Sequence, residues 1–181
     1  MHRLFLTDDS KDNISLLLRS RLPWLVIGLI IGIIATIFIA GFEEILSENI
    51  ALAFFLPVIV YMTDAIGTQT ETIYVRFLSK YKDNFAAYIL KEIMIGLVFG
   101  TIFGLLLFGF AFIWLHAIQI AMTVGITMFI NACIAPVLAL LIPEFIFKQH
   151  SDPALGAGPF TTVIQDLISI LIYFTVAAII I

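Results

Sequence analysis

The sequence predicts an all-α membrane protein with five transmembrane helices, preceded by a short amphipathic helix at the membrane interface. Of the 181 residues, 62% are hydrophobic and 12% are charged, whereas a soluble domain is about half apolar and a quarter charged. The mean hydropathy is +1.14. A soluble monomer of this size could not bury so many apolar side chains, so much of its surface must contact lipid.

The composition also excludes several other classes of protein. The net charge is −4 and no basic patch suits a nucleic-acid backbone, so we expect no nucleic acid partner. The single cysteine, Cys133, cannot form an internal disulfide, and no Cys/His cluster indicates zinc. The first 21 residues carry several charges and are followed by a long apolar stretch, which is not typical of a cleavable signal peptide.

The spans follow from the gaps between charged residues, because a helix needs about 20 apolar residues to cross the hydrocarbon core. Residues 22–42 carry no charge, and residues 50–73 carry only Asp64 and Glu71. The 51 residues from 93 to 143 are uncharged, which predicts a hairpin that turns near 115–119. We therefore expect one pore domain, residues 22–181, with spans at about 22–42, 50–75, 86–115, 118–147 and 158–181.

The preceding residues, 1–21, form an N-terminal segment of different character. Thr7 or Asp8 can cap a helix, and three consecutive leucines at 16–18 give that helix an apolar side. We expect residues 8–20 to form an amphipathic anchor in the inner interface. The alternative is that this segment plugs the pathway.

The orientation follows from the basic residues, which are enriched on the cytoplasmic side of membrane proteins. With five spans, all nine Lys and Arg residues fall on one side, whereas the opposite loops carry Glu43, Glu44 and Glu48. We expect a multi-pass protein of the cell's inner (plasma) membrane, with a cytoplasmic N-terminus and an external C-terminus. Trp24 and Trp114 would then lie at opposite membrane interfaces.

Two rows of small residues predict close helix packing. Gly96, Gly100 and Gly104 repeat every four residues, and so do Gly28 and Gly32. Small residues on one face let helix backbones approach closely in lipid. Either face could also be a subunit interface. Five helices are few to enclose a pathway, so we expect a homodimer.

Asp166 is the clearest ionisable residue at membrane depth, where a charge needs a functional or structural reason. Thr162, Ser169 and Tyr173 share its helix face. This polar stripe suits a water-filled path better than lipid contact. The alternative is a carboxylate that hydrogen-bonds to a neighbouring helix.

The second polar group lies in residues 63–71. On a helix, Asp64, Thr68 and Glu71 share one face. Asp64 and Asp166 each lie roughly 18–21 Å from the inner surface, counted at about 1.5 Å per residue, so they can face each other. Glu71 lies nearer the inner mouth, where a basic side chain, Arg76 or Lys91, could pair with it instead.

The candidate ligands are carboxylate, hydroxyl, amide and carbonyl oxygens, which suit Mg²⁺, Ca²⁺ and Mn²⁺. Mg²⁺ gives up water reluctantly, so a pore can hold it through its water shell. Thr123, Thr127 and Asn131 add weak oxygen donors, although we favour hydrogen bonding between helices for them. The three histidines, at positions 2, 116 and 150, lie at ends and loops, where we expect them to be solvated.

Several motifs resemble those of the MgtE-type magnesium channels and transporters, over roughly residues 19–181. The most specific similarity is in the last loop and span. The matching motifs are Arg21-Leu22-Pro23-Trp24-Leu25, Leu56-Pro57, Gly67-x-Gln69, Arg76, Asp152-Pro153-Ala154, Gly158-Pro159, Thr161-Thr162, Asp166 and Ile172-Tyr173-Phe174.

The resemblance implies a homodimer with a pore on its axis, lined mainly by spans two and five. It assigns Asp166 to the pore site, where Mg²⁺ is held largely hydrated, and places Asp152 near the inner mouth. Two departures stand out. Thr63-Asp64-Ala65 stands where the family has Gly-Gly-Asn. The family's cytoplasmic N domain and paired CBS modules are also missing from this sequence, which is either a minimal member of the family or a piece of a longer chain. A separate regulatory protein could supply the gate.

We therefore expect no enzyme but a channel that conducts Mg²⁺, with Mn²⁺, Co²⁺ or Ca²⁺ as alternative ions. A secondary transporter that exchanges the ion with Na⁺ or H⁺ is the first alternative. An intramembrane aspartyl protease and a scaffold subunit of a larger complex are weaker ones. The residues expected to bind the ion are Asp166, Asp64, Thr162, Thr68, Gln69, Glu71 and Asp152.

Overall fold

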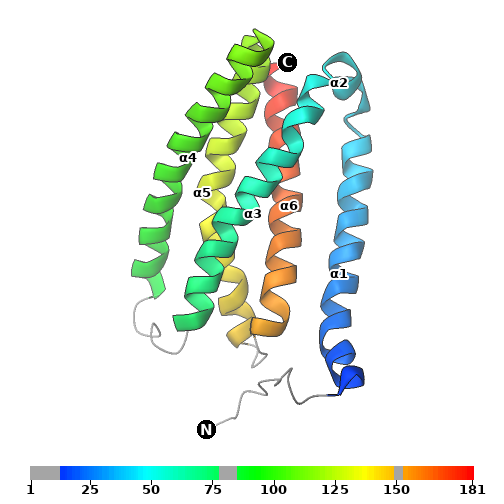
Figure 1. Ribbon diagram of the computed structural model, residues 1–181, viewed down its shortest axis with the longest axis vertical. Coiled ribbons are helices and arrows are strands. Elements are labelled where there is room, and N and C mark those ends of the chain that lie inside the picture. Colours follow the sequence, from blue (N-terminus) through cyan, green and yellow to red (C-terminus); the bar gives the residue numbers. More distant parts are fainter. Residues whose placement is uncertain (1–12, 78–84, 149–152) are drawn as a thin grey trace.

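The computed structural model describes residues 13–77, 85–148 and 153–181, and within these ranges every regular element is a helix (Figure 1). Five helices are long and apolar enough to cross a membrane, as predicted. The sixth, α2, has only six residues. The helices are α1 (Ile14–Ala40), α2 (Glu43–Glu48), α3 (Ala51–Phe77), α4 (Phe85–Leu115), α5 (Ile118–Lys148) and α6 (Pro153–Ile180).

The N-terminal part of α1 extends the first span. Residues 14–21 are helical, as expected for the interfacial segment, and they continue into the span without an interruption. Residues 8–12 of that segment lie outside the described ranges. The sequence analysis did not predict α2, which occupies the loop between α1 and α3. Its first turn carries Glu43 and Glu44, whose negative charges favour a helix N-terminus.

The predicted hairpin is confirmed, and it turns where expected. Helix α4 ends at Leu115 and α5 begins at Ile118. Between them, His116 has a φ of 51°, the left-handed conformation that reverses the chain. The turn lies at the upper end of the molecule, where the end of α4 and the start of α5 lie beside each other (Figure 1).

The glycine row of α4 packs inside the subunit. A Cβ atom added at Gly96, Gly100 or Gly104 would lie 2.9, 2.7 or 2.8 Å from a backbone carbonyl oxygen of α5. Only glycine permits so close an approach of two helix backbones. The row in α1 behaves differently, because a Cβ at Gly28 would lie 3.1 Å from Val163 whereas one at Gly32 would meet nothing within 4 Å.

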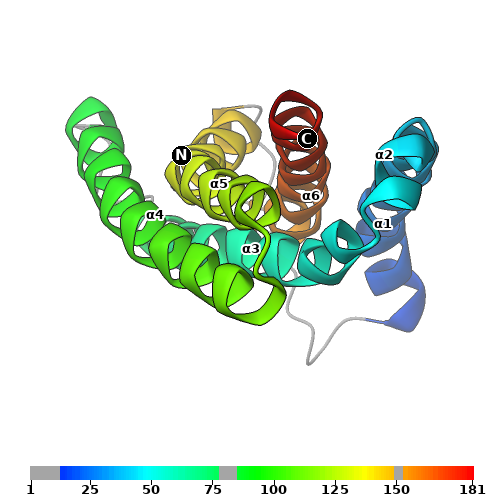
Figure 2. The ribbon, with the colours of Figure 1, turned by 90° about the horizontal axis from the view of Figure 1, so that it is seen from above.

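The helices form two rows when seen from above (Figure 2). Helices α4 and α3 lie in one row and α5 and α6 in the other, while α1 packs against α6 at the edge. A core cluster near the start of α3 and the end of α6 joins these helices to α5. Within it, the Tyr173 hydroxyl of α6 donates a 2.7 Å hydrogen bond to the Leu52 carbonyl oxygen of α3. This contact fixes α6 against α3.

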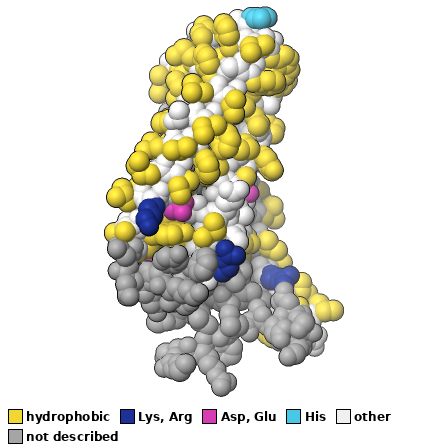
Figure 3. Space-filling view, turned by 60° about the vertical axis from the view of Figure 1, so that its left-hand side comes forward, with side chains coloured by type: hydrophobic (Ala, Val, Ile, Leu, Met, Phe, Trp, Pro, Cys, Tyr) yellow, Lys and Arg dark blue, Asp and Glu magenta, His cyan; other side chains and the backbone are white. Residues whose placement is uncertain are grey.

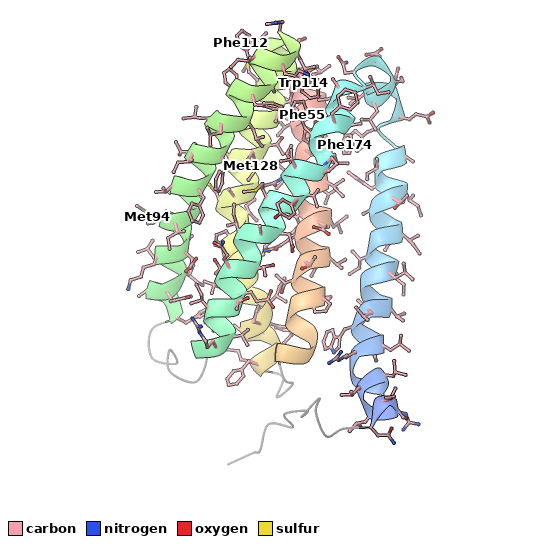
Figure 4. All side chains as sticks on the ribbon, in the orientation of Figure 1. Phe55, Met94, Phe112, Trp114, Met128 and Phe174 are labelled. Atoms are coloured by element: carbon pink, nitrogen blue, oxygen red, sulfur yellow. The ribbon has the colours of Figure 1, made fainter. Side chains whose placement is uncertain are left out.

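The two ends of the bundle differ in charge. Lys and Arg side chains gather near the lower end, and hydrophobic side chains cover most of the face above them (Figure 3). Trp24 packs against Phe160 near the start of α6, with ring centroids 6.0 Å apart. Trp114 lies at the opposite end beside Phe55, with centroids 5.9 Å apart (Figure 4). The two tryptophans therefore lie at opposite ends.

Candidate functional site

The candidate site lies where α3 packs against α6, in the middle of the bundle. Asp64 lies 13 residues before the end of α3 at Phe77, and Asp166 lies 13 residues after the start of α6 at Pro153. Both of these helix ends are at the lower end of the molecule (Figure 1). At 1.5 Å per residue, each aspartate is about 20 Å from that end. The equal depth that the sequence predicted is therefore present.

Asp64 and Asp166 interact electrostatically across the α3–α6 contact. Both side chains are half-buried. The Oδ1 atom of Asp64 is buried and has no hydrogen-bond partner within the described ranges. Two interacting carboxylates at membrane depth form a negative position, which favours a bound cation.

The other residues predicted on α3 and α6 surround this pair unevenly. Thr162 is half-buried one turn from Asp166, whereas Thr68 and Gln69 are exposed on α3. Glu71 is buried beside the Thr161 hydroxyl of α6, and the alternative of an ion pair with a basic side chain stays a prediction. Asp152 lies outside the described residues.

The four residues of the polar stripe on α6 differ in burial, because Thr162 and Asp166 are half-buried whereas Ser169 and Tyr173 are fully buried. Ser169 and Tyr173 do not accompany Asp166, because both are buried inside the subunit. The Ser169 hydroxyl donates to the Gln165 carbonyl oxygen at 2.7 Å, and Tyr173 donates to α3 as described above. The prediction that these two residues line a water-filled path with Asp166 is therefore wrong.

Gln165 is a residue that the sequence analysis missed. Its side chain is 1% exposed, and its Nε2 donates a 2.9 Å hydrogen bond to the Ala135 carbonyl oxygen of α5. The carboxamide lies over Gly67 of α3, where an added Cβ would be 2.6 Å from the Gln165 Cδ. Gln165 thus joins α3, α5 and α6 beside the aspartates. Its spacing of four residues from Thr161 and Ser169 could have revealed this buried face.

The three polar residues of α5 do not form the predicted hydrogen bonds between helices. The Thr123 hydroxyl donates to the Gln119 carbonyl oxygen of its own helix at 2.9 Å, a common arrangement for threonine in helices. The side-chain polar atoms of Thr127 and Asn131 are buried without a partner in the described part of the chain.

Two further carboxylates near the lower end are already satisfied by hydrogen bonds. Thr70 donates to Glu92 at 2.9 Å, which joins α3 to α4. Tyr74 donates to Glu144 at 2.6 Å, and Glu144 also pairs with Lys148 at 3.1 Å. The carboxylates of Glu92 and Glu144 therefore have hydrogen-bond partners within the subunit, whereas the Oδ1 atom of Asp64 has none among the described residues.

One subunit does not complete a metal centre by itself. Among the described residues, no three His, Cys, Asp or Glu side chains converge on a point that an ion could occupy. Mg²⁺ is usually bound by one or two carboxylates and keeps several waters. The chemistry of the Asp64–Asp166 pair therefore fits a hydrated divalent cation better than a fully dehydrated one.

Comparison with known proteins places this site in a family. The model of the MgtE family, described as divalent cation transporters, matches residues 56–176, a range that contains both aspartates. The magnesium transporter MgtE of Enterococcus faecalis is 35% identical over 161 residues, and that of Bacillus subtilis is 34% identical over 160 residues. The magnesium transporter MgtE of Thermus thermophilus is 29% identical over 162 residues.

Each of these alignments covers 87% of this chain but 36% of the relative, so the chain spans about a third of the length of the proteins it matches. The family model covers most of α3 and α6 and all of α4 and α5. Its members are transporters and not enzymes, which removes the membrane-protease alternative. From the matched family model and the five apolar helices, this multi-pass membrane chain belongs to the MgtE family of divalent cation transporters.

Proposed function

We propose that two copies of this chain form a channel that conducts Mg²⁺ across the membrane between the α3 and α6 helices of each subunit. The observation that carries the proposal is the Asp64–Asp166 pair, in which one carboxylate oxygen is buried without a partner among the described residues. A cation can stabilise both carboxylates, because electrostatic attraction is strong in a low-dielectric environment. The curated relatives, which are magnesium transporters, support Mg²⁺ as the ion.

The exposed polar residues of α3 support a homodimer. Thr68 and Gln69 lie nine and eight residues before the end of α3 at Phe77, within the span, yet both are exposed in one subunit. Polar side chains at this depth avoid lipid and face water or another protein surface. A second subunit that covers this face would enclose a hydrated path and bring four aspartates together.

The carboxylates and the neutral oxygen ligands would then have different roles in binding the ion. Asp64 and Asp166 would attract the divalent ion, and the oxygens of Thr162, Thr68 and Gln69 would hydrogen-bond to its water shell. Asp152 would lie at the inner mouth. The same ligands also suit Mn²⁺, Co²⁺ and Ca²⁺, so ion preference depends on the dimensions of the assembled pore.

The distribution of charge supports an orientation in the plasma membrane. The described basic residues lie near the ends of α1, α3, α4 and α5 that point to the lower side in Figure 1; they are Arg19, Arg21, Arg76, Lys91 and Lys148. By the positive-inside rule this side is cytoplasmic, so the N-terminus is inside and the C-terminus is outside. A regulatory domain or protein on this side could control the inner mouth.

The direct test is Mg²⁺ uptake into liposomes that contain the purified chain. We expect uptake by the wild type, loss of at least about tenfold in Asp166→Ala, and a smaller loss in Asp64→Ala. Glu92→Gln is the matched control, because it neutralises a buried carboxylate that is already bonded to Thr70. It should retain most of the flux.

The driving force distinguishes the channel from the exchanger. Flux that reverses with voltage and needs no Na⁺ or H⁺ gradient is expected for a channel. Flux that depends on either gradient would instead establish the secondary transporter. If the wild-type chain moves no Mg²⁺ under any gradient or voltage, the proposal that this chain alone forms the pathway is wrong.

A further inference from the structure

Glu71 is a buried carboxylate that the Asp64–Asp166 pair does not use. It lies on α3, seven residues closer than Asp64 to the lower end of the helix. Seven residues are about two turns, or about 10 Å along the helix axis. Asp64 and Glu71 therefore share a face of α3 and interact electrostatically. Their separation is large enough for two ions to occupy the two positions at the same time.

The surroundings of Glu71 provide little to stabilise its charge. Its side chain is 9% exposed, and the groups that act on its charge are the Thr161 hydroxyl and the negatively charged Asp64. An isolated carboxylate in a low-dielectric interior is costly, so such groups are normally paired or bind a cation. Glu92 and Glu144, near the same end of the bundle, each accept a short hydrogen bond from a neighbouring helix.

A second oxygen lies beside Glu71 and comes from α6. The Thr161 hydroxyl is the polar neighbour of the Glu71 carboxylate. The Thr161 side chain is 1% exposed, and its Oγ1 does not reach hydrogen-bond geometry with any group in the described part of the chain. Gly158, also of α6, adjoins the carboxylate, because an added Cβ there would lie 3.9 Å from the Glu71 Oε1, at ordinary contact distance. A carboxylate and a hydroxyl from two neighbouring helices are oxygen ligands suitable for a hydrated divalent cation.

We propose that Glu71 and Thr161 form a second binding position for a divalent cation, on the inner side of the Asp64–Asp166 position. This inference rests on the proposed pathway between α3 and α6. Ions would pass through the two positions in sequence. Asp64 and Glu71 interact electrostatically, so a cation bound at one position lowers the affinity of the other position for a second cation. This repulsion helps the second cation to leave, as in other multi-ion pores.

The two positions can be separated by measuring Mg²⁺ currents in a planar bilayer while Mg²⁺ is varied on one side at a time. Glu71→Gln preserves the shape of the side chain and removes its charge. We expect it to raise the half-saturating Mg²⁺ concentration on the inner side by about tenfold, the usual scale for losing one supporting ligand, and to change the outer-side value by less than about twofold. Thr161→Val should shift the same inner-side value in the same direction by a smaller factor.

Glu92→Gln is again the matched control. Glu92 is also a buried carboxylate, and its hydrogen-bond donor, Thr70, is the residue directly before Glu71 on α3. The substitution therefore removes the same charge at a similar depth but outside the proposed position. It should leave both half-saturating concentrations unchanged.

Two results would overturn the second position. Equal shifts of the inner-side half-saturating Mg²⁺ concentration in Glu71→Gln and Glu92→Gln would indicate that removing any negative charge near this end has the same effect, and that Glu71 does not form a binding position. Unchanged values in both Glu71→Gln and Thr161→Val would show that neither side chain meets the ion. Absence of any current in the wild type would instead contradict the proposed function itself.

Discussion

The α4–α5 hairpin and the α3–α6 pair are both helix pairs inside one subunit, but they are held together differently. In the hairpin, the glycines of α4 pack directly against backbone carbonyl oxygens of α5, with no side chain between the two helix backbones. In the α3–α6 pair, side-chain oxygens of Asp64, Thr161 and Gln165 are buried without partners among the described residues. Thr127 and Asn131 of α5 also carry buried polar atoms without a partner in the described part of the chain, but the carboxylate among these unpartnered groups, Asp64, belongs to the α3–α6 pair, where water or an ion can satisfy it.

The surface of each pair agrees with this difference. An apolar cavity of about 370 Å³ on the hairpin is lined by Gly100, Gly104, Phe108, Met122 and neighbouring side chains, a surface suited to lipid. The α3–α6 pair instead exposes Thr68 and Gln69 at membrane depth. This difference supports the proposal that the α3–α6 pair carries the ion pathway and that the hairpin is its scaffold.

Gly100→Ala should cause the largest loss of stability. The added methyl group would lie 2.7 Å from the Phe129 carbonyl oxygen, so the helices must separate. Overpacking of this kind costs about 1–3 kcal/mol, which a thermal unfolding measurement in detergent would detect. Gly109→Ala on the same helix is the control, because an added Cβ there meets nothing within 4 Å. Equal effects of the two substitutions would show that the glycine row is not a packing device.

Gly67→Ala should have an intermediate effect that depends on Gln165. The new methyl group would displace the Gln165 carboxamide and break its 2.9 Å hydrogen bond to Ala135. Loss of this bond costs about 1 kcal/mol. Gln165→Ala in the same chain should relieve the clash, so a double-mutant cycle should give a coupling energy above about 0.5 kcal/mol. Additive effects would contradict the contact.

Tyr173→Phe should have the smallest effect. It removes the hydroxyl that donates to the Leu52 carbonyl oxygen at 2.7 Å but keeps the buried ring. The expected loss is about 0.5–1.5 kcal/mol in the free energy of unfolding. Thr175→Val is the control, because the exposed Thr175 hydroxyl bonds only to its own helix. If the two variants lose the same stability, the link between α3 and α6 contributes nothing specific.

The sequence predicted the spans well because charge is costly in lipid, and the gaps between charged residues therefore mark the helices. It also predicted the hairpin turn from the length of the uncharged stretch, the glycine packing of α4 from the four-residue spacing, and the equal depth of Asp64 and Asp166 from the rise per residue of a helix. The short helix α2 escaped prediction because six residues provide too little pattern to distinguish a helix from a loop.

The details of the site were harder to predict. Helical periodicity places Ser169 and Tyr173 on the same helix face as Asp166. It does not determine which residues of that face the neighbouring helices bury and which stay accessible. Gln165 escaped attention because its role depends on Gly67 of another helix, a contact between residues far apart in the sequence. Tertiary packing decides such matters, and it is not visible in local patterns.

The most direct test of the central claim compares the two regions by the effect of Mg²⁺ on thermal unfolding at constant ionic strength. A ligand that binds the folded state raises stability by about 2.7 kcal/mol at one hundred times its Kd. We predict that Mg²⁺ raises the unfolding temperature of the wild type. Gly100→Ala should start lower and show the same rise, whereas Asp64→Ala/Asp166→Ala should lose most of it. If Mg²⁺ raises the unfolding temperature of the double aspartate variant as much as that of the wild type, Mg²⁺ binds elsewhere and the account is contradicted.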